Sequence, residues 1–576
     1  MLTPWGEALD KTNVLPEYPR PQLRRDSYLN LNGFWDYAIT ASPEPPECRD
    51  GKILVPFSPE CELSGVKRNL LPGQFLWYRR DIDLPEDFLR GEDSRVLLHF
   101  GAVDYVCSVF LGGKEVYRHV GGYTPFTVDV TDAAAAGRFE LLVRVIDATD
   151  KADQTRGKQK LKPGGIWYPP PSGIWQTVWM ECVPGNYIRG LRILPRYDTR
   201  EIELWVAGEG ECQAEFCGCV HRFPAGQPAV LPVPELHPWS PEDPFLYELR
   251  LTLGDDRVGS YFAMRKFSVE ADAEGRKRLF LNNAPYFHNG VLDQGYWSDG
   301  LLTAPSDEAM IFDIETAKRM GFNMLRKHVK VEPLRWYYHC DRLGMLVWQD
   351  IPNGGARYRP LIVSAPLVTD LHIKDDRYAL FGRKRPESRQ QYYNELHEIL
   401  NTLISCPCIA MWVPFNEGWG QFDAEKVCER ILETDNTRTI DHASGWHDQG
   451  IGDIRSEHVY FRPYRFAPDA QDRAVVLSEF GGYTLRIQGH SREGRQFGYK
   501  RFDSANSFRF ALAELYRKQI APACAEGLAA AVYTQLSDVE TELNGLLTYD
   551  RRAAKISPGL LRNIVRIGPT SSSNTP

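Results

Sequence analysis

The first third of the chain is a succession of short hydrophobic runs separated by glycine turns. From about residue 20 to residue 185, β-branched or aromatic runs such as Val106–Leu111 and Glu140–Val145 are about five or six residues long, and turns such as Gly112-Gly113 separate them. No stretch in this region shows a convincing helical period. The pattern predicts an all-β sandwich over residues 1–185.

A second set of alternating runs follows from residue 186 to residue 270. It includes Ile202–Val206 and Leu246–Leu253, and a proline-rich connection, Val233–Phe245, lies between them. A region of this length with alternating hydrophobic and polar positions is typical of a small immunoglobulin-like β-sandwich.

From residue 271 onward, hydrophobic runs alternate with stretches of helical period. Gly321 and Gly344 each follow such a stretch, as expected at helix ends. Eight runs and the helices between most of them predict a (β/α)8 barrel over residues 271–567. The Ser/Thr/Pro-rich residues 568–576 are expected to be disordered. The eight predicted strands are Tyr286–Leu292, Phe322–Leu325, Gly344–Trp348, Ile409–Val413, Thr439–Ile440, His458–Tyr460, Val475–Leu477 and Ala529–Thr534.

Polar and aromatic side chains gather where these predicted strands end. In a parallel barrel the carboxyl ends of the strands form one rim, and that rim carries the chemistry. A simple binding domain has no need of so many polar groups at the ends of buried strands. The candidate site residues are Asp293, Arg326, His328, Asn416, Glu417, Trp446, Tyr460, Glu479, Gln535 and Asp538.

Glu417 and Glu479 are the strongest candidates for catalysis. They follow the fourth and seventh predicted strands and can converge across the barrel mouth. A retaining glycosidase needs two carboxyl groups about 5–5.5 Å apart, one protonated as the general acid and one ionised as the nucleophile. The alternative for each residue is a structural glutamate paired with an arginine at a strand end.

Short motifs distributed over nearly the whole chain carry a family resemblance. They are Pro19–Gln22, Leu31–Trp35, Gly121–Phe126, Gly173–Gln176, Arg265–Phe267, Val413–Glu417 and Ser478–Gly481. In these motifs the chain resembles glycoside hydrolase family 2, the group of β-galactosidases and β-glucuronidases. The resemblance implies a jelly-roll domain for the first sandwich, and retention of a β-linkage without a redox cofactor.

The resemblance also implies a role for each carboxylate. Val413–Glu417 matches the acid/base motif and Ser478–Gly481 the nucleophile motif, so Glu417 is expected to be the acid/base and Glu479 the nucleophile. Asn416 can hydrogen-bond the sugar 2-hydroxyl. We expect Tyr460 to orient Glu479, and Arg326 either to hold a carboxylate ionised or to form a structural ion pair.

The choice of sugar rests on places where the chain departs from the family pattern. The family's Asn-x-Lys motif, which grips glucuronide carboxylates, should fall near Glu542-Leu-Asn544, and no lysine is there. The family's Arg-x-x-His reads Arg326-Lys-His328. We therefore expect β-galactosidase-like activity first, with β-glucuronidase or β-galacturonidase as the alternative. Other cations in predicted barrel-top loops could replace the missing lysine, although a solvated surface position is the expected role for each: Arg357, Arg359, Arg492, Arg495 and Lys500.

The remaining expectations concern metals and one long loop. The metal-ligand motif of some large β-galactosidases is replaced by Asp350–Pro352, so no metal or other cofactor is expected. The loop from Asn353 to Pro386 is too long to be spare chain in a compact barrel, and we expect it to shape the aglycone side. A non-catalytic carbohydrate-binding protein is the alternative of another class, and intact Glu417 and Glu479 argue against it.

Charge and cysteine content exclude several partners. The net charge is −8 without a basic block, which argues against nucleic acid and anionic membranes. Twelve cysteines without a pairing rhythm, and a start without a basic and apolar leader, favour reduced thiols in the cytoplasm. The expected partner is a carbohydrate substrate, and the sequence leaves homo-oligomerisation open.

Overall fold

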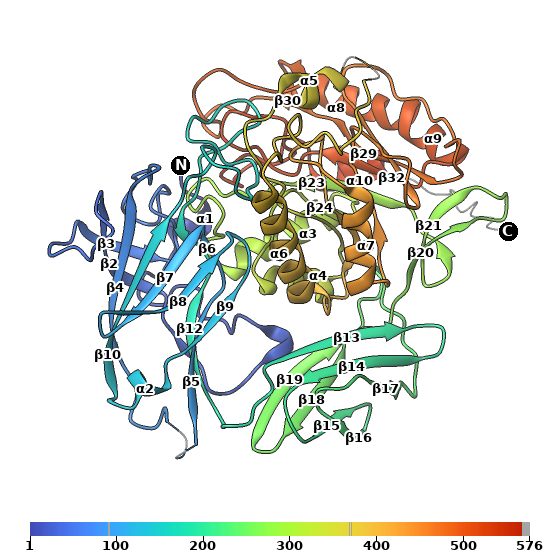
Figure 1. Cartoon of the computed structure of the whole chain (residues 1–576). Helices are drawn as coiled ribbons and strands as arrows, with labels where there is room; N and C mark the ends of the chain where they lie inside the picture. The colour runs from blue at the N-terminus through green and yellow to red at the C-terminus, as the bar shows by residue number, and fades with distance from the viewer. Residues whose placement is uncertain (90, 92, 368, 370, 567–576) are drawn as a thin grey trace.

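A computed structural model describes residues 1–566 except residues 90, 92, 368 and 370. The predicted disordered tail, residues 568–576, lies outside the described residues. Figure 1 shows the three parts of the chain: the blue first sandwich, the green second sandwich below it, and the yellow-to-red barrel beside both.

The first part is a two-sheet antiparallel sandwich, as predicted. In β10, Leu141, Val143 and Val145 are buried and alternate with partly exposed residues, so one face of the strand packs into the core. The four-stranded sheet has the order β1 (Leu29–Asn30), β12 (Val178–Val183), β5 (Arg95–Phe100), β9 (Phe126–Asp129). The six-stranded sheet has the order β3 (Gly51–Val55), β2 (Gly33–Thr40), β4 (Phe75–Asp83), β10 (Arg138–Ile146), β7 (Val106–Leu111), β8 (Lys114–Val120).

The second part is a smaller sandwich, which confirms the immunoglobulin-like architecture. Strand β18 shows strict alternation, with Tyr247, Leu249, Leu251 and Leu253 buried. One sheet is β13 (Gly190–Arg196), β14 (Glu201–Ala207), β17 (Ala229–Pro232). The other is β16 (Cys219–Pro224), β15 (Glu211–Phe216), β18 (Tyr247–Leu253), β19 (Asp256–Phe262). A small sheet, β20 (Phe267–Ala271), β21 (Lys277–Leu281) and β22 (Ala284–Pro285), leads into the barrel.

The third part is an eight-stranded parallel barrel, also as predicted. Ser306 caps the first barrel helix by accepting a bond from the Ala309 amide, and Gly344, at φ +71°, ends the second helix. The strand order is β27 (Thr439–Ile440), β26 (Ile409–Val413), β25 (Leu346–Asp350), β24 (Met324–Lys327), β23 (His288–Asp293), β32 (Ala530–Thr534), β29 (Ala474–Gly481), β28 (Ile454–Val459). The helices include α3 (Asp307–Arg319), α4 (Leu334–Leu343), α6 (Pro386–Leu403), α7 (Ala424–Thr434), α8 (Ala505–Leu515), α9 (Ala521–Glu526) and α10 (Pro558–Val565).

Three barrel strands extend further than the hydrophobic pattern predicted. β24 continues to Lys327, so Arg326 lies inside the strand, and β29 continues to Gly481, so Glu479 lies inside it as well. β28 begins at Ile454 rather than at His458. Charged side chains fill the barrel interior here, paired with one another, and a prediction based on hydrophobicity therefore makes each strand too short, at the end of β24 and β29 and at the start of β28.

The first sandwich is fastened to the barrel by buried polar contacts. Tyr105 Oη and Thr155 Oγ1 donate to Glu395 Oε1 on α6, at 2.7 Å and 2.6 Å. The segment from Gln154 to Trp175 then crosses to the barrel, where the amide of Gly354 donates to the carbonyl of Arg156 at 3.0 Å. Tyr168 and Trp175 of this segment are fully buried, so the segment is packed against the rest of the protein.

The long loop after β25 contains a short helix, α5 (Pro360–Val363), and a 3-10 turn, Ala365–Leu367. Its base is held by the buried Arg383, whose guanidinium donates to the carbonyls of Asn353 and Gly420. Within the described residues, no helix is both long and apolar enough to cross a membrane, and all twelve cysteines are free thiols.

Candidate active site

Glu417 stands on a sharp turn just beyond β26. Its φ of +48° is in the left-handed region, which non-glycine residues rarely adopt. The turn is held because the Glu417 amide donates to the carbonyl of Ser444 at 2.9 Å and the Trp419 amide donates to that of Asn416 at 2.8 Å. Such strain is typical of functional positions, where it fixes the direction of a side chain.

Glu479 lies within β29 and both of its carboxylate oxygens are engaged. Arg326 Nη1 donates to Oε1 at 3.1 Å, and the Tyr460 hydroxyl donates to Oε2. Tyr460 and Arg326, both expected to act on the carboxylates, thus lie in contact with Glu479, and their roles stay predictions. Two donors to one carboxylate favour its ionised form and fix its orientation.

The two carboxylates approach each other closely. One oxygen of Glu417, one oxygen of Glu479 and a ring nitrogen of His458 all lie within 4.8 Å of one another. This separation fits the short spacing of retaining glycosidases better than the roughly 6.5–9.5 Å of inverting ones. Both side chains are nearly buried, with 8% and 4% of the residue surface exposed for Glu417 and Glu479.

Arg326 organises the floor of the site. Its guanidinium, fully buried, binds Asp350 through two nitrogens at 3.0 Å and 3.1 Å and donates to Asn416 Oδ1 at 2.8 Å. The bond from Arg326 fixes the orientation of the Asn416 amide. The side-chain nitrogen of Asn416 is buried and has no protein partner. That orientation leaves an amide donor beside Glu417 for a sugar hydroxyl.

His328 is held by the same floor. Its Nδ1 lies 2.8 Å from Asp350 Oδ2. Burial lowers the pKa of His328 well below its ordinary value, so the ring is neutral. With Nδ1 donating to Asp350, Nε2 is an acceptor for a hydroxyl group. The shorter Arg326-Lys-His328 spacing therefore still brings the imidazole to the site.

His458, which was not among the candidates predicted from the sequence, lies between the two carboxylates. Nδ1 is 3.0 Å from Glu417 Oε1 and Nε2 is 3.6 Å from Glu479 Oε1. His458 and Glu479 are register partners on the neighbouring strands β28 and β29. A Cβ at Gly445 would lie 2.5 Å from the His458 ring, so the absence of a side chain at Gly445 makes room for the ring. Burial alternates along β28 and His458 is on the buried face, but Ile454–Val459 has no alternation of apolar and polar residues that would have shown this in the sequence.

The two carboxylates are pushed toward opposite protonation states. Burial raises the pKa of Glu417, and the negative charge of Glu479 raises it as well, although contact with His458 opposes them. Burial would also raise the pKa of Glu479, but His458, Arg326 and Tyr460 outweigh burial and lower it. The arrangement thus favours the protonated form of Glu417 and the ionised form of Glu479 at the same rim.

Three predicted binding residues lie in polar networks instead of beside the carboxylate pair. Asp293 Oδ2 accepts from Lys327 at 2.6 Å, and Asp538 Oδ1 accepts from Lys555 at 2.6 Å. Gln535 bonds to Gln294 and to Asn544. A substrate-binding role for Asp293, Gln535 and Asp538 remains a prediction.

A pocket of about 460 Å³ is lined by His458 and Tyr460, which contact the carboxylates, although neither carboxylate lines the pocket itself. Trp446, His458 and Tyr460 line its barrel side, and Leu371 and His372 from the long loop line the other. Its size suits a small ligand. The Trp446 ring lies 5.4 Å from that of His458, and its indole nitrogen is buried without a protein partner.

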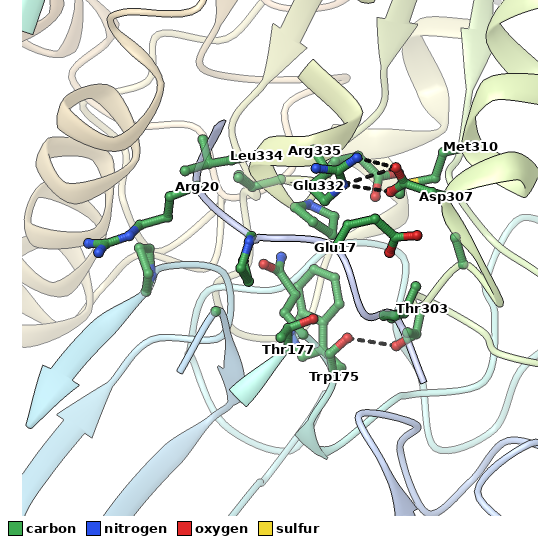
Figure 2. A pocket seen from close by; sticks show the side chains of 18 of the residues that line it. Glu17, Arg20, Trp175, Thr177, Thr303, Asp307, Met310, Glu332, Leu334 and Arg335 are labelled. Atoms are coloured by element: carbon green, nitrogen blue, oxygen red, sulfur yellow. Dashed lines mark hydrogen bonds and ion pairs between the residues drawn. The ribbon is translucent and has the colours of Figure 1, made fainter. Parts of the chain in front are cut away.

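A second cavity, of about 70 Å³, lies between the first sandwich and the barrel, away from the carboxylates (Figure 2). Figure 2 shows the Arg335 guanidinium paired with Asp307 and the Thr303 hydroxyl bonded to the carbonyl of Trp175. Its volume is enough for about two water molecules and too small for a sugar ring. We interpret it as a gap in domain packing.

Comparison with known proteins agrees with this geometry. Two family models match: "Glycosyl hydrolase 2 galactose-binding domain-like" over residues 66–175 and "Glycosyl hydrolases family 2, TIM barrel domain" over residues 275–483. The chain is 24% identical to a β-glucuronidase of Rattus norvegicus over 337 residues, 52% of this chain and 51% of the relative. It is 22% identical to a β-galactosidase of Thermoanaerobacter pseudethanolicus, over 62% of this chain and 46% of the relative.

The solved structures extend the similarity to the whole fold. A β-glucuronidase of an uncultured Clostridium species superposes with a TM-score of 0.71 at 17% identity, over 94% of this chain and 99% of that one. The matches to the curated relatives above span only about half of those proteins' length. Together, the two matched domains, the fold and the motifs around both carboxylates show that the chain belongs to glycoside hydrolase family 2.

Proposed function

We propose that this protein is a retaining exo-β-glycosidase that removes terminal β-linked sugars by double displacement. The observation that carries the proposal is the carboxylate pair: Glu417 and Glu479 approach within 4.8 Å and their pKa values are shifted in opposite directions. A short separation leaves no room for a water molecule between sugar and carboxylate, which favours direct attack by the carboxylate.

In the first step, an oxygen of Glu479 forms a bond to the anomeric carbon while the bond to the aglycone oxygen breaks. Glu417 transfers its proton to that leaving oxygen. The contacts of Arg326 and Tyr460 hold Glu479 ionised and aimed before the sugar arrives. The free side-chain nitrogen of Asn416 is placed to donate to the 2-hydroxyl as charge develops on the ring.

In the second step, Glu417 accepts a proton from water while the water oxygen attacks the anomeric carbon and the bond to Glu479 breaks. Formation of the glycosyl ester removes the negative charge that had raised the pKa of Glu417. Its pKa therefore falls after the first step, and the acid becomes a base when a base is needed. The sugar leaves with its original anomeric configuration.

Two sugar classes compete for the glycone position. A β-galactoside was the first expectation, and the buried Glu542 and Asn544, bonded to each other at 3.1 Å, offer no cation where the family's lysine would lie. A β-glucuronide or β-galacturonide is favoured by the names of the relatives, most of which are β-glucuronidases. A panel of chromogenic β-galactosides, β-glucosides, β-glucuronides and β-galacturonides, with α-linked controls, decides between them.

The mechanism is tested by two variants with different chemical consequences. Glu479→Ala should abolish turnover, whereas Glu417→Ala should slow it by about 10²–10⁴-fold on substrates that need a protonated leaving group. Azide should rescue Glu417→Ala, because an anionic nucleophile needs no general base, and the product should be a β-glycosyl azide. An α-configured azide, or full activity of Glu479→Ala, would overturn the proposal. Wild-type protein that binds sugars but hydrolyses none would favour the non-catalytic alternative.

A further inference from the structure

Lys158, a residue of the first sandwich, places its ammonium group at the candidate active site. It lies on the segment that crosses to the barrel, and only 6% of its surface is exposed. Its positive charge acts on both Glu417 and His328, where it lowers the pKa of each. The ammonium also lies 5.9 Å from the ring centroid of Trp419, two residues after Glu417.

The Lys158 ammonium has no ionic partner among the described residues. No carboxylate lies within 4.0 Å of it there, and no hydrogen bond satisfies its three donors. The residue as a whole is more than nine-tenths buried, while the nitrogen keeps some access to solvent and can therefore be reached by a ligand. A buried ammonium group costs free energy unless an anion compensates it. An uncompensated lysine next to a ligand site is therefore a candidate for binding an anionic ligand.

Neighbouring cations of the barrel do not share this property. Lys327 is paired with Asp293 and Glu332, at 2.6 Å and 2.7 Å. Lys555 is paired with Asp538, and Arg326 with Asp350 and Glu479. These cations serve the scaffold or the nucleophile and are not available for a second anion.

Aromatic rings continue the site outward from Lys158. Trp167, Tyr358 and Trp419 come from the first sandwich, the long loop and the turn after β26, and we call them the aromatic wall. Their ring centroids lie 5.2–6.2 Å apart. The Lys160 ammonium stands 4.0 Å from the Trp167 centroid. Aromatic faces stack on the apolar faces of sugar rings, so a wall with ammonium groups along it suits a sugar that carries an acid.

We propose that Lys158 determines specificity by binding an acidic group of the substrate, a carboxylate or a sulfate, against the aromatic wall. This inference rests on the proposed glycosidase function. The acid is carried either by the terminal sugar or by the unit attached to it, and both offer the same chemistry to the ammonium. The first sandwich thus takes part in substrate selection, and the loss of the family's lysine near Glu542 is compensated from another domain.

The experiment compares Lys158→Gln with wild-type enzyme on matched pairs of substrates. One pair is 4-nitrophenyl β-galacturonide and β-galactoside, which differ by an acid on the terminal sugar. The other is 4-carboxyphenyl and phenyl β-galactoside, which differ by an acid on the aglycone. Lys158→Gln should lower kcat/KM by about 10- to 100-fold more on the acidic member of one pair than on its neutral partner. Lys158→Arg should restore most of the preference, and 0.5 M NaCl should weaken it.

Lys162→Gln is the matched control, because Lys162 lies on the same segment and is exposed. Lys162→Gln should leave the ratio of kcat/KM on the acidic substrate to kcat/KM on the neutral substrate unchanged. Equal losses on acidic and neutral substrates for Lys158→Gln would overturn the proposal, as would a Lys162→Gln effect of the same size.

Binding separates this inference from the proposed function. In a Glu479→Gln background, which cannot turn over, calorimetry with galacturonate and galactose measures the preference directly. Lys158→Gln should weaken the binding of galacturonate more than the binding of galactose if the acid is on the terminal sugar. 4-Carboxyphenyl and phenyl β-galactoside give the same comparison for the aglycone. Unaltered binding of every acidic ligand overturns the role of Lys158, even if the enzyme is a glycosidase. A preference lost with the lysine supports it, even if wild-type turnover is absent.

Discussion

Nδ1 of His458 lies 3.0 Å from Oε1 of Glu417, so the proton donor of the proposed mechanism is in contact with a titratable ring. On the other side of the ring, His458 Nε2 lies 3.6 Å from Oε1 of Glu479. Ser444 Oγ and Arg326 Nη1 also lie close to Nε2, at 3.1 Å and 3.4 Å. His458 therefore couples the two carboxylates and positions both.

Replacing His458 should move the whole pH profile of kcat/KM to higher pH. The profile needs Glu479 ionised on its acidic limb and Glu417 protonated on its basic limb. His458 lowers the pKa of both groups, so His458→Leu should raise both and shift both limbs upward. His288→Gln is the control, since His288 is buried against Trp348 elsewhere in the barrel. If both limbs of the kcat/KM profile stayed at the same pH and only the maximum fell, His458 would have a packing role alone.

Tyr460→Phe removes the hydroxyl that donates to Oε2 of Glu479. The nucleophile then loses one of its two fixed donors, and kcat should fall by about 10- to 100-fold with a smaller change in KM. Tyr516→Phe is the control for the loss of a tyrosine hydroxyl, because Tyr516 is buried and its hydroxyl has no protein partner. Similar losses in both variants would mean that removal of any buried hydroxyl, rather than the contact with Glu479, explains the effect.

Arg326→Gln should reduce both stability and activity. It leaves Asp350 and Glu479 buried without their shared cation, which costs about 3–5 kcal/mol of the free energy of unfolding. Urea unfolding measures this loss. The Arg326 charge also lowers the pKa of Glu479, so the acidic limb of kcat/KM should move to higher pH. If Arg326→Gln does not fold, Arg326→Lys keeps a positive charge, and its acidic limb should stay closer to that of the wild type than the limb of an Arg326→Met variant. An acidic limb that stays in place after the charge is removed would contradict the assignment of Arg326 to the nucleophile.

Shortening the long loop should alter recognition of the aglycone. The loop contributes Tyr358 to the aromatic wall and contacts His447 through the carbonyl of Ile362 at 2.9 Å. Replacing residues 360–371 by a short Gly-Ser bridge should change KM unequally across β-glycosides that differ only in the aglycone. Arg383, which anchors the base of the loop, stays in place. An unchanged KM for every aglycone, or the same fold-change in KM across the series, would rule out this role.

Removal of divalent metals should leave turnover intact. Glu417, His458 and Glu479 are close enough to surround an ion, but the oxygens of Glu479 already accept from Arg326 and Tyr460. A dialysis against EDTA, followed by activity and by metal analysis, tests this. Loss of activity that Mg²⁺ or Zn²⁺ restores would show that the expectation of a metal-free enzyme is wrong.

The fold could be predicted from hydrophobic spacing, whereas its polar interior could not. Ile409–Val413 and Thr439–Ile440 were predicted to the residue because apolar runs there end at proline or polar residues. Strand β29 was cut short at Leu477 because Ser478 and Glu479 are polar, although both lie inside the strand and are buried. The ion pairs that offset the free-energy cost of burying such groups join strands that are distant in sequence, so no local sequence pattern reveals them.

The same limit applies to the site. Glu417 and Glu479 were found because their motifs are local, and Arg326 and Tyr460 because they end strands. His458 lies two residues before Tyr460, in a strand whose start was predicted wrongly. Its place in the site can be recognised only from the strand pairing that sets it opposite Glu479. Lys158 belongs to a different domain, and only the docking of that domain brings its ammonium to Trp419.

The buried contacts of Glu395 with Tyr105 and Thr155 have a consequence for how unfolding can be followed. If the first sandwich detaches before the barrel melts, the carboxylate pair survives while Lys158 departs. In mild denaturant, hydrolysis of acidic substrates would then decline at a lower concentration than hydrolysis of neutral ones. The ratio of two colorimetric rates would report the undocking of a domain, an event that circular dichroism of a protein with so many strands would scarcely register.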